Sequence, residues 1–248
     1  MTLVQSPPTN ALPIITWQKL PDDFVLPDEP VESNIQPLLA AALGESLELA
    51  GLIIESMLIA SNFGLCACVG DKTVVKAPDW VYVPSVHPLP VGGIRRSYTP
   101  NVEGDKPSVV MEFISATEGG EYSINPHYSY GKWFFYEQIL RIPVYVIFHP
   151  QIGVLEVYFL VDGKYQKQPP DQNQRFFIEA LDLSLGIWTG RKAEIDGHWL
   201  RWWDKSGNLL PWGSELVAQE RQRAEQAEAK AFRLAEKLRE MGLNPEDI

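Results

Sequence analysis

Two apolar runs of the sequence each carry a single carboxylate, and this feature restricts the possible folds more than any other. Asp79 follows a proline within the run Val74–Val83, and Glu112 lies at the centre of the run Ser108–Ser115. A charged side chain inside a buried strand is costly unless it is paired, hydrogen-bonded or bound to a metal. We expect both runs to be strands, and neighbouring strands would bring Asp79 and Glu112 side by side.

Two carboxylates at such a short separation repel each other and favour a hard cation. Mg²⁺ (or Mn²⁺) is the expected ion, because such ions bind oxygen ligands and Mg²⁺ keeps several waters. Water on such a metal has a lowered pKa and can attack a phosphodiester. Lys132 lies on the next expected helix, with Tyr136 one turn later on the same face. A lysine there could orient the water or offset developing charge.

The same residues also have a purely structural interpretation. Asp79 is then a strand-edge residue after a proline, Glu112 pairs with an arginine, and Lys132 is a solvated helix residue. The spacing of these residues by itself leaves both interpretations open.

The order of the remaining elements predicts an α/β fold, with a mixed β-sheet core flanked by helices. A helix is expected from about Ser33 to Ala50, and an aromatic-rich helix over His127–Arg141. Asp162-Gly163 is typical of a two-residue hairpin turn. Residues 84–107, rich in Pro and Gly, are expected to form a long exposed loop. Besides the two acidic runs, the expected strands are Leu52–Asn62, Leu65–Val69, Val144–Phe148 and Val154–Val161.

These elements divide the chain into four expected parts. An irregular, proline-containing arm at 1–30 precedes a core at 31–170, a β-rich appendage at 171–212 and a charged C-terminal helix at 213–248. The appendage contains five Trp residues, which we expect to pack on the sheet. Stacking of nucleic-acid bases on exposed Trp is the alternative.

The C-terminal helix is expected to begin at a Ser214 cap and to run to about Met241, with Gly242 as its stop. Its apolar residues alternate spacings of three and four, which is the pattern of a heptad seam. Because half of these residues are Ala, a solvated single helix and a self-pairing coiled coil both remain open. The seam residues are Ala224, Ala227, Ala231, Leu234, Leu238 and Met241.

The formal net charge of the 248-residue chain is −11. Affinity for phosphates depends on basic residues, so tight constitutive DNA binding is disfavoured, whereas carboxylates gathered around a metal remain compatible with this charge. The two cysteines, Cys66 and Cys68, are expected to be small buried residues, as suits a reducing cytoplasm. We expect no signal peptide and no membrane span, hence a soluble cytoplasmic protein.

Several of these motifs together resemble a known family. Pro78-Asp79, Glu112 in a V-x-E-F-x-S strand, Lys132-x-x-x-Tyr136 and the Asp162-Gly163 hairpin are similar to the Uma-type family, which is described as restriction endonucleases and is expanded in cyanobacteria. The resemblance covers roughly residues 30–170. It implies a PD-(D/E)XK nuclease fold, with Asp79 and Glu112 as metal ligands and DNA as the substrate.

One position departs from what the resemblance implies. Nuclease superfamily members carry a lysine two residues after the strand glutamate, where this chain has Ile114. Lys132, reaching over from the helix, is the candidate catalytic lysine, and Tyr136 is the candidate supporting residue beside it. Glu32 is a further candidate ligand. The stretch Glu118–Glu121 has the composition of a surface turn.

Three functions follow from these expectations. The first is a Mg²⁺-dependent endonuclease acting on DNA as a homodimer, since cutting two strands requires two sites. The second is a nuclease fold without activity that serves as a binding or scaffold module, as the net charge and Ile114 would favour. The third is a chain whose helical tail mainly assembles with partner proteins.

Overall fold

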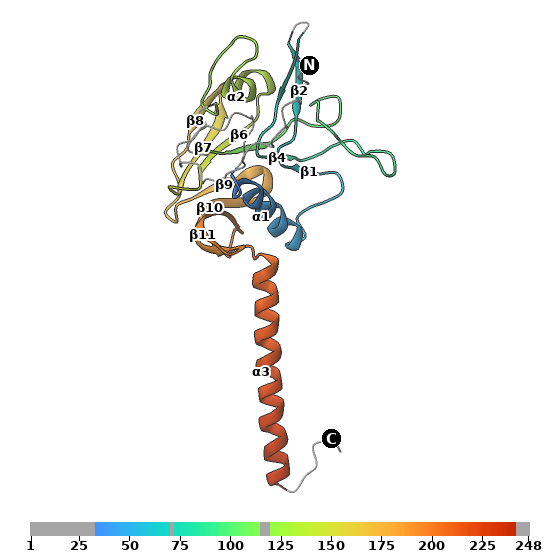
Figure 1. Ribbon diagram of the computed structural model, residues 1–248, viewed down its shortest axis with the longest axis vertical. Helices are drawn as coiled ribbons and strands as arrows, with labels where there is room; N and C mark the ends of the chain where they lie inside the picture. Colours follow the sequence, from blue (N-terminus) through green and yellow to red (C-terminus); the bar gives the residue numbers. More distant parts are fainter. Residues whose placement is uncertain (1–32, 70–71, 115–119, 242–248) are drawn as a thin grey trace, which may run out of the picture. The chain divides into compact units, whose positions relative to one another are not determined.

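The centre of the structure, a computed structural model that describes residues 33–69, 72–114 and 120–241, is a mixed six-stranded β-sheet (Figure 1). Its strand order is β1-β4-β5-β6-β7-β8, and every neighbouring pair is antiparallel except β5 and β6. Parallel neighbours need a crossover connection, which here contains α2 and η1. The strands are β1 (Leu58–Ala60), β4 (Trp80–Val83), β5 (Val109–Phe113), β6 (Val144–His149), β7 (Val154–Val161) and β8 (Lys164–Lys167).

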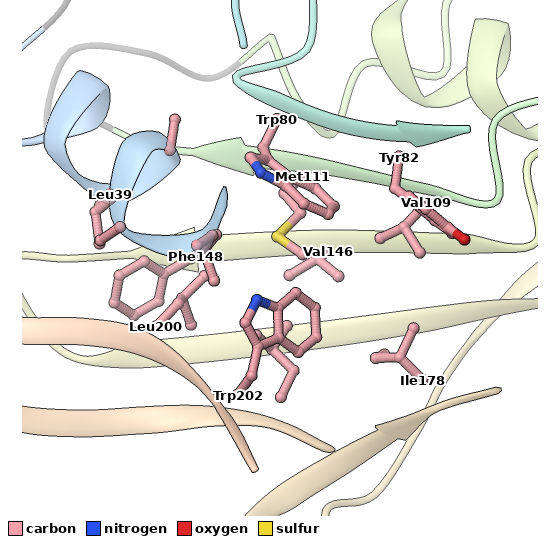
Figure 2. Packing of buried hydrophobic residues seen from close by; sticks show 14 of the residues in the cluster. Leu39, Trp80, Tyr82, Val109, Met111, Val146, Phe148, Ile178, Leu200 and Trp202 are labelled. Carbon is pink, nitrogen blue, oxygen red and sulfur yellow. The ribbon is translucent and has the colours of Figure 1, made fainter. Parts of the chain in front are cut away.

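The central strand β5 is buried along its whole length and sends alternate side chains to the two faces of the sheet. Val109, Met111 and Phe113 belong to one apolar cluster, together with α1 (Gln36–Leu49) and a second sheet. Figure 2 shows this packing, with Leu39, Leu200 and Trp202 against the face that carries Met111 and Val146.

The opposite face of the sheet is covered by different elements. Val110 and Ile114 of the β5 segment pack there against the crossover helix and the two-stranded sheet β2-β3. Glu112 projects to this face as well, since it alternates with Met111 and Phe113. The elements of this face are β2 (Leu65–Val69), β3 (Lys72–Lys76), α2 (Lys132–Phe134) and the π-helix η1 (Phe135–Leu140).

The tryptophan-rich appendage is a three-stranded antiparallel sheet that packs on the first face. Trp199, Trp202 and Trp212 are buried, and the ring of Trp202 lies 6.1 Å from that of Trp80. The expected packing of these aromatics is therefore confirmed, and base stacking on these three side chains is ruled out by their burial. The sheet consists of β9 (Arg175–Ile178), which the short helix η2 (Glu179–Leu181) joins to β10 (Leu183–Lys192), and β11 (Ile195–Trp203).

Several expected elements occur as predicted. β2 has the predicted bounds, and Asp162 and Gly163 both adopt positive φ (50° and 78°), as a tight hairpin turn requires. Residues 84–107, which the structure describes in full, contain no helix or strand. Most of this loop is exposed, although Tyr98 is buried.

Other boundaries were wrong for identifiable reasons. Val74–Val83 is two strands, β3 and β4, because the chain breaks at Ala77-Pro78 and proline cannot continue a sheet ladder. Only the end of Leu52–Asn62 forms a strand, β1. The helix expected over His127–Arg141 begins at Lys132. Cys68 is exposed rather than buried, and Cys66 is half-buried.

The C-terminal helix α3 (Gly213–Glu240) has no buried residue among those that the structure describes. Ser214 is not its cap; the helix begins one residue earlier, and the Glu215 carboxylate accepts a hydrogen bond from the Trp212 backbone N–H at 2.8 Å. The predicted stop at Gly242 lies outside the described residues. Within the described part of the chain, no helix is both long and apolar enough to cross a lipid bilayer.

One buried arginine joins α3 to the appendage. Arg201 is fully buried, lies 3.5 Å from the Trp212 ring centroid, and donates two hydrogen bonds to Glu215 at 2.7 and 3.0 Å. The Glu215 side chain is itself 37% exposed, but its removal would leave the buried Arg201 charge uncompensated, which is destabilising.

We expect Glu215→Ala to lower the free energy of unfolding by about 3 kcal/mol, because the buried Arg201 guanidinium loses its carboxylate. Glu225→Ala is the matched control, since Glu225 pairs with Arg221 on the same helix but both side chains are exposed. That control should leave stability nearly unchanged. Chemical denaturation of both variants measures the difference, and equal effects would contradict the importance of the buried pair.

Candidate active site

The pairing of β4 with β5 brings the two predicted carboxylates together. Trp80 is the partner of Met111 in this antiparallel pair, so Asp79, one residue earlier, falls opposite Glu112. The Oδ2 atom of Asp79 accepts a hydrogen bond from the backbone N–H of Phe113 at 2.5 Å. Pro78 ends the preceding strand and allows Asp79 to stand at the start of β4, beside the centre of the sheet.

Glu112 is almost completely enclosed, with an exposed fraction of 1%. Its Oε2 atom accepts a hydrogen bond from Lys132 Nζ at 2.9 Å, and its Oε1 atom accepts one from Tyr136 Oη at 2.9 Å. The two donors are four residues apart on α2 and η1, so they face the same side of the crossover. All four residues predicted for the site therefore converge.

These contacts also test the structural interpretation of Glu112 and Lys132, in which an arginine pairs with Glu112 and Lys132 is solvated. Glu112 is paired with a lysine and a tyrosine rather than an arginine. Lys132 is not a solvated helix residue, because its ammonium group is bonded to a fully buried carboxylate and its side chain is only 28% exposed.

The position of the missing strand lysine is filled by an apolar side chain. Ile114 is 7% exposed and packs in the cluster that also contains Tyr136. An ammonium group nevertheless reaches Glu112, since Lys132 supplies it from the crossover helix. The ammonium group beside Glu112 thus comes from the crossover and not from the strand; its catalytic role stays a prediction.

The burial of the site changes the proton affinities of its groups. Burial raises the pKa of Glu112 to about 8, against the opposing effect of the Lys132 charge, and the nearby Asp79 carboxylate adds to the rise. Burial by itself would lower the pKa of Lys132, but Glu112, Asp79 and Glu121 together hold it above its ordinary value. The pKa of Lys76 is lowered by its burial and by the charge of Lys132.

Two polar residues next to the site were not predicted. Glu121 is 3% exposed, and its Oε1 atom lies 3.8 Å from Lys132 Nζ. Gln36, at the start of α1, is buried and donates a hydrogen bond to the Phe113 carbonyl oxygen. The turn composition around Glu121 suggested an exposed residue, which was wrong. Glu32, the further candidate ligand, lies outside the described residues, as do positions 115–119.

A profile of the Uma2 family, described as "Putative restriction endonuclease", matches residues 24–193. The chain belongs to the Uma2 family. The matched region contains the whole six-stranded sheet and extends through β9 and β10, beyond the range of the resemblance found in the sequence. The chain matches neither a curated protein nor a solved structure.

The residues present are compatible with the divalent metal that the nuclease fold implies. Two adjacent carboxylates are the hard oxygen donors that Mg²⁺ and Mn²⁺ prefer. Among the described residues, no group of three or more His, Cys, Asp or Glu side chains is placed to hold a metal ion. A cation bound by Asp79 and Glu112 would therefore keep several waters, as Mg²⁺ commonly does.

The raised pKa of Glu112 predicts how stability depends on pH. Between pH 4.5 and about 8, the raised pKa keeps a proton on Glu112 in the folded protein. The unfolded chain, in which this group has its ordinary pKa of 4.5, has released that proton. In the absence of added metal, the free energy of unfolding should therefore fall as pH rises from about 4.5 to about 8, by at most ~1.4 kcal/mol per pH unit.

The difference in the free energy of unfolding between wild type and Glu112→Gln isolates the contribution of Glu112, because the glutamine cannot titrate and mimics the protonated acid. Urea unfolding at a series of pH values should show a flatter profile for the variant. Parallel profiles for the two proteins would mean that Glu112 is ionised in the folded state throughout this range.

Proposed function

We propose that this protein is a Mg²⁺-dependent (or Mn²⁺-dependent) endonuclease that hydrolyses DNA phosphodiester bonds. The observation that carries the proposal is the buried Glu112, which lies opposite Asp79 and is bonded to both Lys132 and Tyr136. Membership of a family described as restriction endonucleases supports DNA as the substrate.

Each of the four residues has a distinct role in this proposal. Asp79 and Glu112 would hold the metal, which when bound would supply positive charge beside the scissile phosphate and a water of lowered pKa. Lys132 places an ammonium group next to the same carboxylate, where it can orient a water molecule or offset charge on the leaving oxygen. Tyr136 fixes the orientation of Glu112 through its hydrogen bond.

The local charge near the site differs from the charge of the whole chain. The net charge is −11, which disfavours broad non-specific DNA binding. Lys132 is near the acidic pair, and Lys76 lies close enough to Lys132 for their charges to interact. Arg95, in contrast, is bonded to Glu103 at 2.7 Å. The two lysines would add to the attraction for phosphate that a bound metal supplies.

A nuclease fold that only binds or serves as a scaffold is the second candidate function. It is favoured by Ile114 in place of the strand lysine and by the hydrogen bonds that already occupy both Glu112 oxygens. In such a protein the four residues would form a buried polar network that stabilises the sheet. Such a protein would not cut DNA even when the metal concentration is high.

A plasmid-cleavage assay with Mg²⁺ and with Mn²⁺ separates these two functions. We expect metal-dependent cleavage by wild type and none by Asp79→Asn or Glu112→Gln, because each removes a metal-binding carboxylate. Lys132→Met should lose about 100-fold in rate or more, on the order of the effect of a proton-transfer or charge-stabilising group.

Glu137→Gln is the matched control for these variants. Glu137 is a buried acid on the same crossover helix, but it bonds to the Tyr165 backbone N–H and not to the site. Cleavage by this control should match wild type. Cleavage that survives in Asp79→Asn would point to a contaminating nuclease, and no cleavage by wild type with either metal would favour the scaffold function.

We further propose that the protein acts as a homodimer through α3. Five of the six seam residues are exposed, including Leu234 at 52% and Met241, at the end of the helix, at 73%; Leu238 is partly exposed. An exposed seam of this kind is buried when two helices pair. Two nuclease sites would then be joined in one particle, as cutting both DNA strands requires.

Sedimentation equilibrium tests this assembly. Wild type should form a dimer, and Leu234→Lys should weaken it about tenfold or more, because a charge enters the seam. Phe232→Lys is the matched control, since Phe232 is exposed but lies off the seam. A wild-type monomer, or equal effects of the two substitutions, would exclude pairing through this seam.

A further inference from the structure

Glu121 is a buried acid that the four-residue site leaves unexplained. It is 3% exposed, and its Oε2 atom has no hydrogen-bond partner among the residues that the structure describes. Buried polar groups are normally bonded, so an unpaired carboxylate oxygen calls for a physical reason. The Lys132 ammonium group lies 3.8 Å from the other oxygen, Oε1.

The position of Glu121 is fixed by the structure around it. Its backbone carbonyl oxygen accepts a hydrogen bond from Tyr145 Oη at 2.9 Å. The next residue, Tyr122, stacks on Trp133 of α2 with ring centroids 6.4 Å apart. Glu121 is therefore held against the beginning of the crossover helix, next to Lys132.

The backbone of this segment also approaches α2 closely. The Ser123 carbonyl oxygen would lie 1.9 Å from a Cβ atom at Gly131, so only glycine fits there. The absence of a side chain at Gly131, directly before Lys132, thus allows the segment that carries Glu121 to pack against the beginning of α2. This close approach holds the Glu121 carboxylate near the Lys132 ammonium group, at 3.8 Å.

Lys132 has more donors than its present bond uses. An ammonium group carries three N–H donors, and one is directed at Glu112 Oε2. Both oxygens of Glu112 already accept hydrogen bonds, so a cation that binds Glu112 must share or take over one of them. That cation would also repel the ammonium group, which then needs another acceptor.

We propose that Glu121 is a positioning residue for Lys132: it is the second acceptor of the ammonium group and receives it when a divalent cation binds Glu112. This inference rests on the proposed metal-dependent function. A shift of about 1 Å brings Nζ from 3.8 Å to hydrogen-bonding distance of Glu121. Lys132 then remains beside the site instead of leaving it for solvent.

Calorimetric titration of Mn²⁺ tests the role of Glu121 in metal binding. Glu121→Gln leaves the ammonium group only a neutral amide oxygen as acceptor, so it should weaken Mn²⁺ binding about tenfold, the effect expected when a residue that supports a metal ligand is impaired. In a Lys132→Met background the same change should weaken binding less than about threefold, because no ammonium group needs an acceptor. Glu121→Asp, which keeps the charge, should stay within about threefold of wild type. These differences are expected because Glu121 would affect Mn²⁺ binding through Lys132, so the effects of changing the two residues would not be additive.

Glu137→Gln is again the control and should bind Mn²⁺ as wild type does. If Glu121→Gln behaves like this control, or if its effect is the same with and without Lys132, the inference is overturned. A purely structural role for Glu121 would weaken binding equally in both backgrounds.

A measurement on the metal-free protein separates this inference from the proposed function. The unfolding equilibria of wild type, Glu121→Gln, Lys132→Met and the double variant form a double-mutant cycle. We expect the two changes to be coupled by about fivefold in the unfolding equilibrium constant. If wild type binds no Mn²⁺, the proposed function fails, and this cycle alone decides whether Glu121 and Lys132 interact. Purely additive effects of the two substitutions would overturn the inference.

Discussion

The buried hydrogen bonds of Glu112 are the constraint on which the arrangement of the core depends. β5 is the central strand and is buried at every position, so a carboxylate there must find donors inside the protein. Both donors, Lys132 and Tyr136, come from the crossover that joins β5 to its parallel neighbour β6. The hydrogen bonds of one carboxylate, together with the apolar packing of Phe135 and Leu140, hold this crossover on the sheet.

The two faces of the sheet differ in composition: one is apolar, and the other contains the candidate site. One face is closed by α1 and the tryptophan-rich sheet, whose large apolar side chains form a continuous core with Met111 and Phe113. That face contributes rigidity, because aromatic side chains bury large areas and pack in specific geometries. The other face has apolar surroundings but a polar centre at Glu112. The rigid packing of the first face helps to keep the residues around Glu112 in fixed positions.

The sequence predicted the pattern of the site better than its boundaries. Asp79 and Glu112 could be found because a lone acid among apolar residues is visible without a structure, and the helical spacing of Lys132 and Tyr136 is equally local. The break at Pro78 was visible too, but the apolar residues on both sides suggested one continuous strand. The true start of the crossover helix at Lys132 depends on tertiary contacts of the preceding segment, which no local pattern encodes.

Glu121 and Gln36 show where local patterns stop being informative. Glu121 lies in a stretch of turn-forming residues, and only its distance from Lys132 in the folded chain makes it part of the site. Gln36 begins α1 and contacts Phe113, which is 77 residues away in the sequence. Both residues are polar, common at surfaces, and buried here by long-range packing. Their roles depend on contacts between distant segments, so Glu121 was expected at the surface and Gln36 was not predicted to take part.

Under the proposed function, the charges around the site would let an acidic protein receive a phosphate. The Lys132 ammonium group interacts with three carboxylates, Asp79, Glu112 and Glu121, and its charge also interacts with that of Lys76. Burial raises the pKa of Glu112 to about 8, so this carboxyl would lose its proton when it binds a cation. The three carboxylates and two ammonium groups would then sum to one negative charge, and a divalent cation would change that sum to one positive charge. A phosphodiester carries one negative charge, so attraction for DNA at this place would depend on the bound metal, while the net charge of −11 disfavours binding elsewhere.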